Sequence, residues 1–179
     1  MEQPEPKFSE PGFPPVANRE ADPAWDLGLY AQHTILCMFR AVLTQRQVVW
    51  DNVDVEGVHQ IRVAARRCRT ALQTLDSLWD ADKIKYFRNY LADFADTFGV
   101  SRDLDVMVIY LQEQLAAASG DRATALAWLL ERNQAKRAEE QPRLEQVLRR
   151  LEADDFASEF VDYFSRTPLD LWQLEVADG

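Results

Sequence analysis

Apolar residues recur at steps of three and four along most of this chain, and this spacing constrains the fold more than any other feature. It places apolar side chains on one face of an α-helix, whereas a half-buried strand would need strict alternation. The helical pattern covers residues 24–50, 58–79, 82–98, 101–118, 121–151 and 155–165. No convincing strand pattern is found. The sequence therefore predicts an all-α protein, an antiparallel helical bundle with short connections.

Glycine, serine and proline predict where some of these helices begin and end. Gly99 is expected to end the third helix, and Ser101 is expected to cap the fourth. Pro142 lacks a backbone amide and is expected to bend or divide the long helix that begins near residue 121.

Three regions are predicted along the chain. Residues 1–23 contain six prolines and little apolar periodicity, which favours a flexible or extended arm that adds little to the core. Residues 24–166 form the helical domain, and residues 167–179 form a tail that is loosely held or docks through Leu171 and Trp172. No apolar run reaches the roughly 18 residues needed to span a bilayer, so a cytoplasmic protein without a membrane segment is expected.

Positive charge is concentrated in the middle of an acidic chain. The 179 residues contain 20 Lys and Arg against 30 Asp and Glu, a net charge of -10. Residues 59–102 alone are net positive, with eight bases and five acids. The overall acidity argues against a general nucleic-acid binder, because duplex DNA selects extended basic surfaces. A compact polyanion that contacts one patch remains compatible with this distribution.

The strongest local pattern is the segment HQIRVAARRCRTAL, residues 59–72. At about 100° per residue, His59, Arg62, Arg66 and Arg69 share one helical stripe. The opposite side of the helix gathers apolar residues: Ile61, Ala64, Cys68, Leu72, Leu75 and Trp79. One face is thus predicted to enter a core while the other presents positive charge.

A second motif, GVSRDLDV at residues 99–106, follows the first one in the sequence. Together the two motifs resemble the CHAD family, helical domains named for their conserved histidines. The resemblance extends from about residue 27 to residue 164. It implies an all-α fold and binding of inorganic polyphosphate, in some members beside a CYTH domain and often at polyphosphate granules.

Position by position, the resemblance assigns polyphosphate binding to the second helix, to the R-D motif and, on a less similar stretch, to the third helix. The residues are His59, Arg62, Arg66, Arg67, Arg69, Lys85, Arg88 and Arg102. A full CHAD domain has two such bundles, and nothing after Val106 repeats the HxxRVxxRR pattern. The chain therefore resembles one half of the domain, and a homodimer is hypothesised to supply the missing half.

Arginine suits a phosphate chain because its guanidinium group makes paired, charge-assisted hydrogen bonds to anionic oxygens. Two other interpretations stay open. The arginines could be a solvated face paired with acids such as Asp93, Asp96 or Asp103, or they could form a basic groove that docks an acidic protein partner.

No enzyme motif is found: there is no glycine-rich phosphate loop, GxSxG or HExxH. We expect a non-enzymatic protein without a cofactor. A zinc site from His33, Cys37, His59 and Cys68 has suitable ligand types. Cys68 and His59 point to opposite sides of their helix, however, so no metal site is expected.

Overall fold

The computed structural model describes residues 8, 10–51, 56–153 and 155–166. These residues form α-helices and two short 3-10 helices, without a strand among them. The α-helices are α1 (Leu27–Trp50), α2 (Glu56–Thr74), α3 (Ala81–Thr97), α4 (Gly99–Ala116), α5 (Gly120–Ala153) and α6 (Phe156–Phe164). The 3-10 helices are η1 (Pro15–Asn18) and η2 (Asp76–Leu78). The all-α prediction is confirmed.

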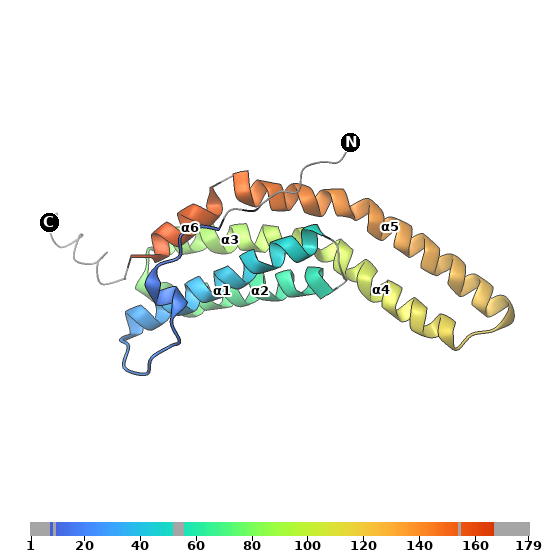
Figure 1. Ribbon diagram of the computed structural model, residues 1–179, viewed down its shortest axis with the longest axis horizontal. Helices are drawn as coiled ribbons and strands as arrows, with labels where there is room; N and C mark the ends of the chain where they lie inside the picture. The colour runs from blue at the N-terminus through green and yellow to red at the C-terminus, as the bar shows by residue number, and fades with distance from the viewer. Residues whose placement is uncertain (1–7, 9, 52–55, 154, 167–179) are drawn as a thin grey trace.

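Helices α1, α2 and α3 lie side by side, and α6 with the second half of α5 covers them (Figure 1). Helix α4 does not turn back on α3 but continues away from the bundle, where it pairs with the first half of α5 (Figure 1). The molecule is therefore a helical bundle with a projecting α4–α5 hairpin, rather than a set of helices that all reverse direction.

The α3–α4 junction differs from the predicted glycine stop. Phe98 ends α3 and precedes α4 in a helical conformation, with φ -82° and ψ 0°, and its side chain is fully buried. Gly99 is the first residue of α4, and Ser101 lies inside the helix instead of capping it. Burial of Phe98 holds the junction nearly helical, so α4 can continue outward.

Helix α6 completes the core by inserting three phenylalanines. Phe160 stacks on Phe39 of α1 with ring centroids 4.0 Å apart, and it contacts Phe87 of α3 edge-on at 5.0 Å. Phe156 stacks on Tyr90 at 3.6 Å. The amphipathic helix predicted for residues 155–165 thus covers the core of the bundle. Burial of each aromatic side chain contributes about 2–3 kcal/mol of transfer free energy.

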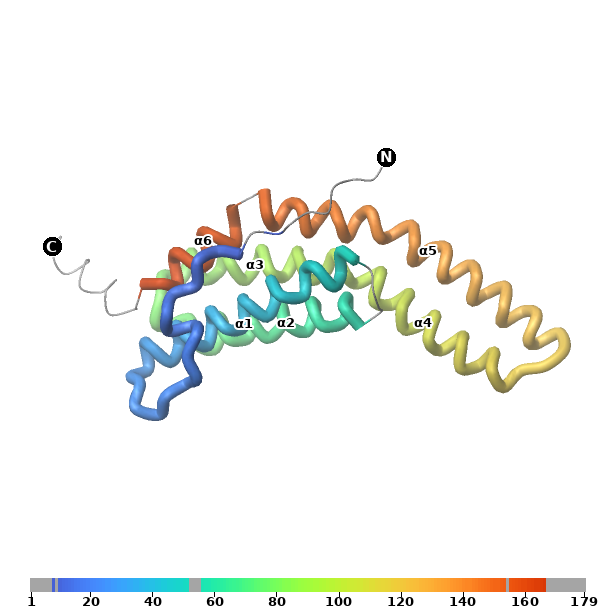
Figure 2. Tube along the Cα trace, in the orientation of Figure 1, coloured from blue at the N-terminus to red at the C-terminus, as the bar shows by residue number. Residues whose placement is uncertain are grey.

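The segment before α1 contributes more to the core than its prolines predicted. Ala17 of η1 is 3% exposed, and Phe13 and Val16 pack against the core. The Arg40 guanidinium donates to the Ala17 carbonyl oxygen at 2.8 Å and to Asn18 Oδ1 at 2.8 Å. Figure 2 shows this blue segment crossing the bundle at the end where α6 lies. The expectation that it adds little to the core is corrected, because side chains of α1 bind its backbone.

Pro142 does not divide α5, which is continuous over 34 residues. The neighbouring Gln141 side chain donates its amide to the Val49 carbonyl at 3.2 Å. This contact joins the Pro142 region of α5 to the last turn of α1. Residues 167–179, the predicted tail, lie outside the described residues.

Candidate functional site

Helix α2 has the two faces that the sequence predicts. Ile61, Cys68 and Leu72 are fully buried and Ala64 is 8% exposed, whereas Arg66 and Arg67 are exposed. His59, Arg62 and Arg69 are partly buried at the flank of the charged face. The helix therefore carries Arg62 and Arg69 at the boundary between core and solvent, and Arg66 and Arg67 in solvent.

Arg62 joins the two sequence motifs in space. Its Nη1 donates to the Ala95 carbonyl oxygen of α3 at 2.8 Å. A Cβ built on Gly99 would lie 3.2 Å from the same Nη1, closer than ordinary van der Waals contact. Glycine at position 99 thus leaves room for the Arg62 guanidinium, which explains its place in the GVSRD motif better than a helix stop does.

The remaining arginines of α2 divide between its two flanks. Arg69 lies seven residues after Arg62, on the side of α3, and its Nε is buried without a hydrogen-bond partner among the described residues. On α3, Arg88 Nη2 donates to Gln73 Oε1 of α2 at 3.3 Å, while Lys85 is exposed. Arg66 and Arg67, in contrast, line a pocket between α1 and α2.

This α1–α2 pocket, of about 400 Å³, escaped the sequence analysis. Polar and charged side chains from both helices border it, but its floor is apolar. The lining residues are Tyr30, Thr34, Met38, Arg66, Arg67, Thr70, Ala71, Thr74 and Leu75. Only the helical stripe of Tyr30, Thr34 and Met38 on α1 could have indicated it, and nothing local shows that this stripe faces Arg67.

Arg102 lies on α4, three residues after Gly99 and beside a buried ion pair. Asp105 Oδ1 accepts from Arg137 Nε of α5 at 2.8 Å, and the Asp105 side chain is 1% exposed. Burial raises the pKa of the Asp105 carboxyl, and the positive charges of Arg137 and Arg102 oppose that shift. Arg102 therefore interacts with a carboxylate of its own helix, and the structure does not group it with Arg66 and Arg67.

The α2 arginines are not neutralised by the acids that the alternative interpretation named. Within the described part of the chain, no salt bridge joins Asp93, Asp96 or Asp103 to any of the eight candidate residues. The basic residue of α3 that does form one is Lys83, with Glu159 of α6 at 3.0 Å. The charged face of α2 is thus left with excess positive charge.

A family model described as the CHAD domain matches residues 35–177 of this chain. The match includes both motifs and every candidate residue. The chain belongs to the CHAD family. A search of curated proteins and a search of solved structures found no match.

The match does not support the prediction of a half-length CHAD member. It runs over one continuous region from residue 35 to residue 177, which is most of the 179-residue chain. The absence of a second HxxRVxxRR pattern, on which that prediction rested, is therefore not sufficient evidence for half a domain. None of the described helices is long and apolar enough to cross a membrane.

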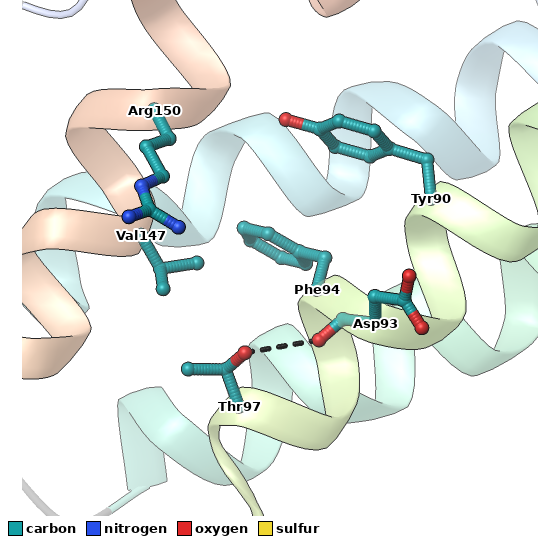
Figure 3. Close-up of a pocket in the computed structure, with 6 residues that line it drawn as sticks. All are labelled: Tyr90, Asp93, Phe94, Thr97, Val147 and Arg150. Carbon is teal, nitrogen blue, oxygen red and sulfur yellow. Dashed lines mark hydrogen bonds between the residues drawn. The ribbon is translucent and has the colours of Figure 1, made fainter.

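A second pocket in this CHAD domain, of about 210 Å³, lies between α3 and α5. Figure 3 shows Arg150 and Val147 of α5 facing Tyr90 and Phe94 of α3. Thr97 Oγ1 donates to the Asp93 carbonyl oxygen at 2.9 Å. This pocket has a single basic side chain, Arg150, and no residue of α2 lines it.

Cys37 and His33 are neighbours on α1, whereas Cys68 is buried on α2. Cys37 Sγ is 3.7 Å from both ring nitrogens of His33, whose Nδ1 lies 2.9 Å from the Val16 carbonyl oxygen. Cys68 is fully buried, and burial raises the pKa of its thiol strongly. The described residues contain no group of three or more His, Cys, Asp or Glu side chains placed to bind a metal ion.

Proposed function

We propose that this chain binds inorganic polyphosphate through the charged face of α2, without catalysing a reaction on it. CHAD domains are a polyphosphate-binding family, and this chain has the family's arginine-rich helix. The observation that carries the proposal is that Arg66, Arg67 and Arg69 form no salt bridge with any carboxylate among the described residues. Like charges held this close on one helix favour a bound anion.

The arrangement suits a linear polymer. Arg62, Arg66 and Arg69 span seven residues of helix, about 10 Å along its axis, and neighbours on this stripe lie about 5–6 Å apart. Arg88 extends the cationic strip onto α3, where Gln73 holds its guanidinium. Successive phosphates can therefore each meet one guanidinium group, and contacts that are weak singly add along the chain.

The other four candidate residues are expected to contribute differently to binding: His59, Arg67, Lys85 and Arg102. His59 stands at the start of the strip and Arg67 on its α1 flank, and both are placed to contact a chain bound at Arg66. Lys85 is exposed on α3 and adds a screened charge. The charge of Arg102 also acts on the nearby Asp105 carboxyl, so we expect it to contribute less than the α2 arginines. We also propose a cytoplasmic location and association with polyphosphate granules.

The test is a titration with long-chain polyphosphate at several salt concentrations. Replacing Arg66 and Arg69 together by Gln is expected to weaken binding about 100-fold, since two lost charge-assisted contacts at about 1.4 kcal/mol each give this factor. The slope of log affinity against log salt is expected to decrease by about 1.5. The matched control is Arg132→Gln with Lys136→Gln, which removes the same charge from the projecting hairpin. Equal affinity of the Arg66 and Arg69 double variant and the wild type would reject the assigned site.

The apolar floor of the α1–α2 pocket favours a second candidate function, docking of an acidic protein segment. Polyphosphate has no group that would bury Met38, Ala71 or Leu75. Competition at matched ionic strength separates the two functions. A scaffold keeps its protein partner in excess polyphosphate, whereas a polyphosphate-binding module loses it.

A further inference from the structure

The α1–α2 pocket has the dimensions of a peptide groove. Its lining extends from Tyr30 to Met38 on α1 and from Arg66 to Thr74 on α2, about 12 Å along each helix axis, with Leu75 just after the end of α2. The volume of about 400 Å³ lies within the range of ordinary ligand sites. We call these nine lining residues the α1–α2 groove.

The groove combines an apolar floor with a cationic rim. Met38, Ala71 and Leu75 are partly buried and pack against the core, which leaves part of each surface open to the groove. Arg66 and Arg67 are exposed at the rim and form no salt bridge with described residues. An occupant that matches both features must carry apolar side chains and carboxylates together.

One segment of this chain has that composition. Residues 167–179, TPLDLWQLEVADG, lie outside the described residues and contain three acids and no base. The acids are Asp170, Glu175 and Asp178, and the apolar residues include Leu169, Leu171, Trp172 and Leu174. The family match continues to residue 177, so most of this segment belongs to the matched domain.

The end of α6 lies close enough for this segment to reach the groove. Phe164 contacts Trp79 with ring centroids 5.2 Å apart, and the Asp80 amide donates to the Tyr163 hydroxyl at 3.2 Å. Leu75 of the groove precedes Trp79 by four residues, so their Cα atoms are at most about 15 Å apart. Thirteen residues span up to about 43 Å when extended. Figure 1 shows the end of α6 and the start of α1 at the same end of the bundle.

We propose that residues 167–179 bind in the α1–α2 groove, with leucine and tryptophan side chains on its apolar floor and carboxylates at Arg66 and Arg67. The tether raises the effective concentration of the segment, so modest contacts are sufficient. Because the segment uses two arginines of the proposed polyphosphate site, it competes with polyphosphate. This competition rests on the proposed function, whereas the docking itself does not.

The docking is tested by cross-linking in the full-length chain. Thr74→Cys at the groove and Gln173→Cys in the segment are combined with Cys37→Ser, and a short bis-maleimide is added. The matched control pairs Gln173→Cys with Gln134→Cys, an exposed position on the projecting hairpin. Docking predicts that the groove pair links within one molecule about tenfold faster than the control pair. Equal rates, or links only between molecules as a second copy would give, overturn the proposal.

Charge reversal provides an independent readout. Arg66→Glu with Arg67→Glu is expected to lower the cross-linking rate to that of the control pair. Adding Asp170→Lys and Glu175→Lys is expected to restore it, because opposite charges again face each other. This rescue also shows that the doubly reversed protein is folded. A cross-linking rate that changes with neither charge reversal contradicts the charge pairing on which the proposal rests.

Polyphosphate separates this inference from the proposed function. Asp170→Asn with Glu175→Gln is expected to raise polyphosphate affinity about threefold to tenfold, and added polyphosphate is expected to slow cross-linking of the groove pair. Charge-dependent cross-linking in a chain that does not bind polyphosphate would support docking and reject the proposed function. Polyphosphate binding with equal cross-linking rates for both pairs would reject docking alone.

Discussion

Single side chains connect the two sequence motifs at the residue scale. Arg62 reaches from the HxxRVxxRR helix to the Ala95 carbonyl and lies over Gly99 of the GVSRD motif. Six residues beyond Gly99, Asp105 is buried and held by Arg137 of α5. The GVSRDLDV segment therefore contributes to packing on both sides: Gly99 makes room for an arginine of α2, and Asp105 pairs with an arginine of α5.

The buried Asp105 carboxyl predicts how the stability of the folded protein depends on pH. Burial raises the pKa of its carboxyl, so the folded protein holds a proton there more strongly than the unfolded chain. The resulting stabilisation is fully present below the unfolded pKa of about 3.9 and is lost as pH rises through the raised folded value. Asn cannot ionise. We therefore expect the stability of Asp105→Asn, relative to the wild type, to increase between pH 4 and pH 7.

Urea unfolding at four pH values checks this expectation. The difference in unfolding free energy between the two proteins is the quantity to compare, because it cancels the titration of the other groups. A difference that stays constant, or that changes in the opposite direction, would show that Arg137 and Arg102 outweigh burial at Asp105.

At the scale of elements, the projecting hairpin is the least protected part of the fold. Between residues 106 and 143, all of them described, Leu111 is the one buried residue. Helices α1 and α2, in contrast, bury apolar residues on nearly every turn. Local stability follows the density of such contacts, so the hairpin should open more readily than the bundle.

Amide hydrogen exchange tests this difference. We expect amides of α4 beyond residue 106 and of α5 before residue 143 to exchange faster than those of α1 and α2. Leu111→Ala should cost about 2 kcal/mol of local opening free energy and should leave exchange in α1 and α2 unchanged. Uniform exchange across both regions would mean that the hairpin opens only when the whole domain unfolds.

At the scale of the whole molecule, the hairpin carries six of the ten large apolar residues that are exposed in the described part of the chain. Tyr110 is 54% exposed and Trp128 is 56% exposed, with Val106, Met107, Ile109 and Leu129 also exposed. Exposed apolar residues that form one patch are typical of an interface. The pairing of two copies remains a prediction, and we expect it to occur at these residues.

Light scattering at micromolar concentration tests the pairing. The expected mass is twice 20.6 kDa for the wild type, and Tyr110→Lys with Trp128→Lys should reduce it to the monomer mass. Ser77→Lys with Asn89→Lys adds the same charge to exposed positions of the bundle and should leave the mass unchanged. A wild-type monomer that still binds polyphosphate would remove the proposal that two copies are needed.

The sequence by itself determined the helices and the two faces of α2. Periodicity is a local property: residues spaced three and four apart must share a face of any helix they form, and burial of Ile61, Cys68 and Leu72 confirms that prediction. The same reasoning could place arginines on the opposite side, but not the neighbours that each would have.

Only the tertiary structure decided those neighbours. It brought Arg62 to the α3–α4 junction, placed Arg66 and Arg67 beside an apolar groove, and directed α4 away from the bundle. It also packed the proline-containing segment onto α1. These outcomes depend on which helices pack together across long separations in the chain, and that is set by the complementarity of whole surfaces rather than by the spacing of residues within one helix.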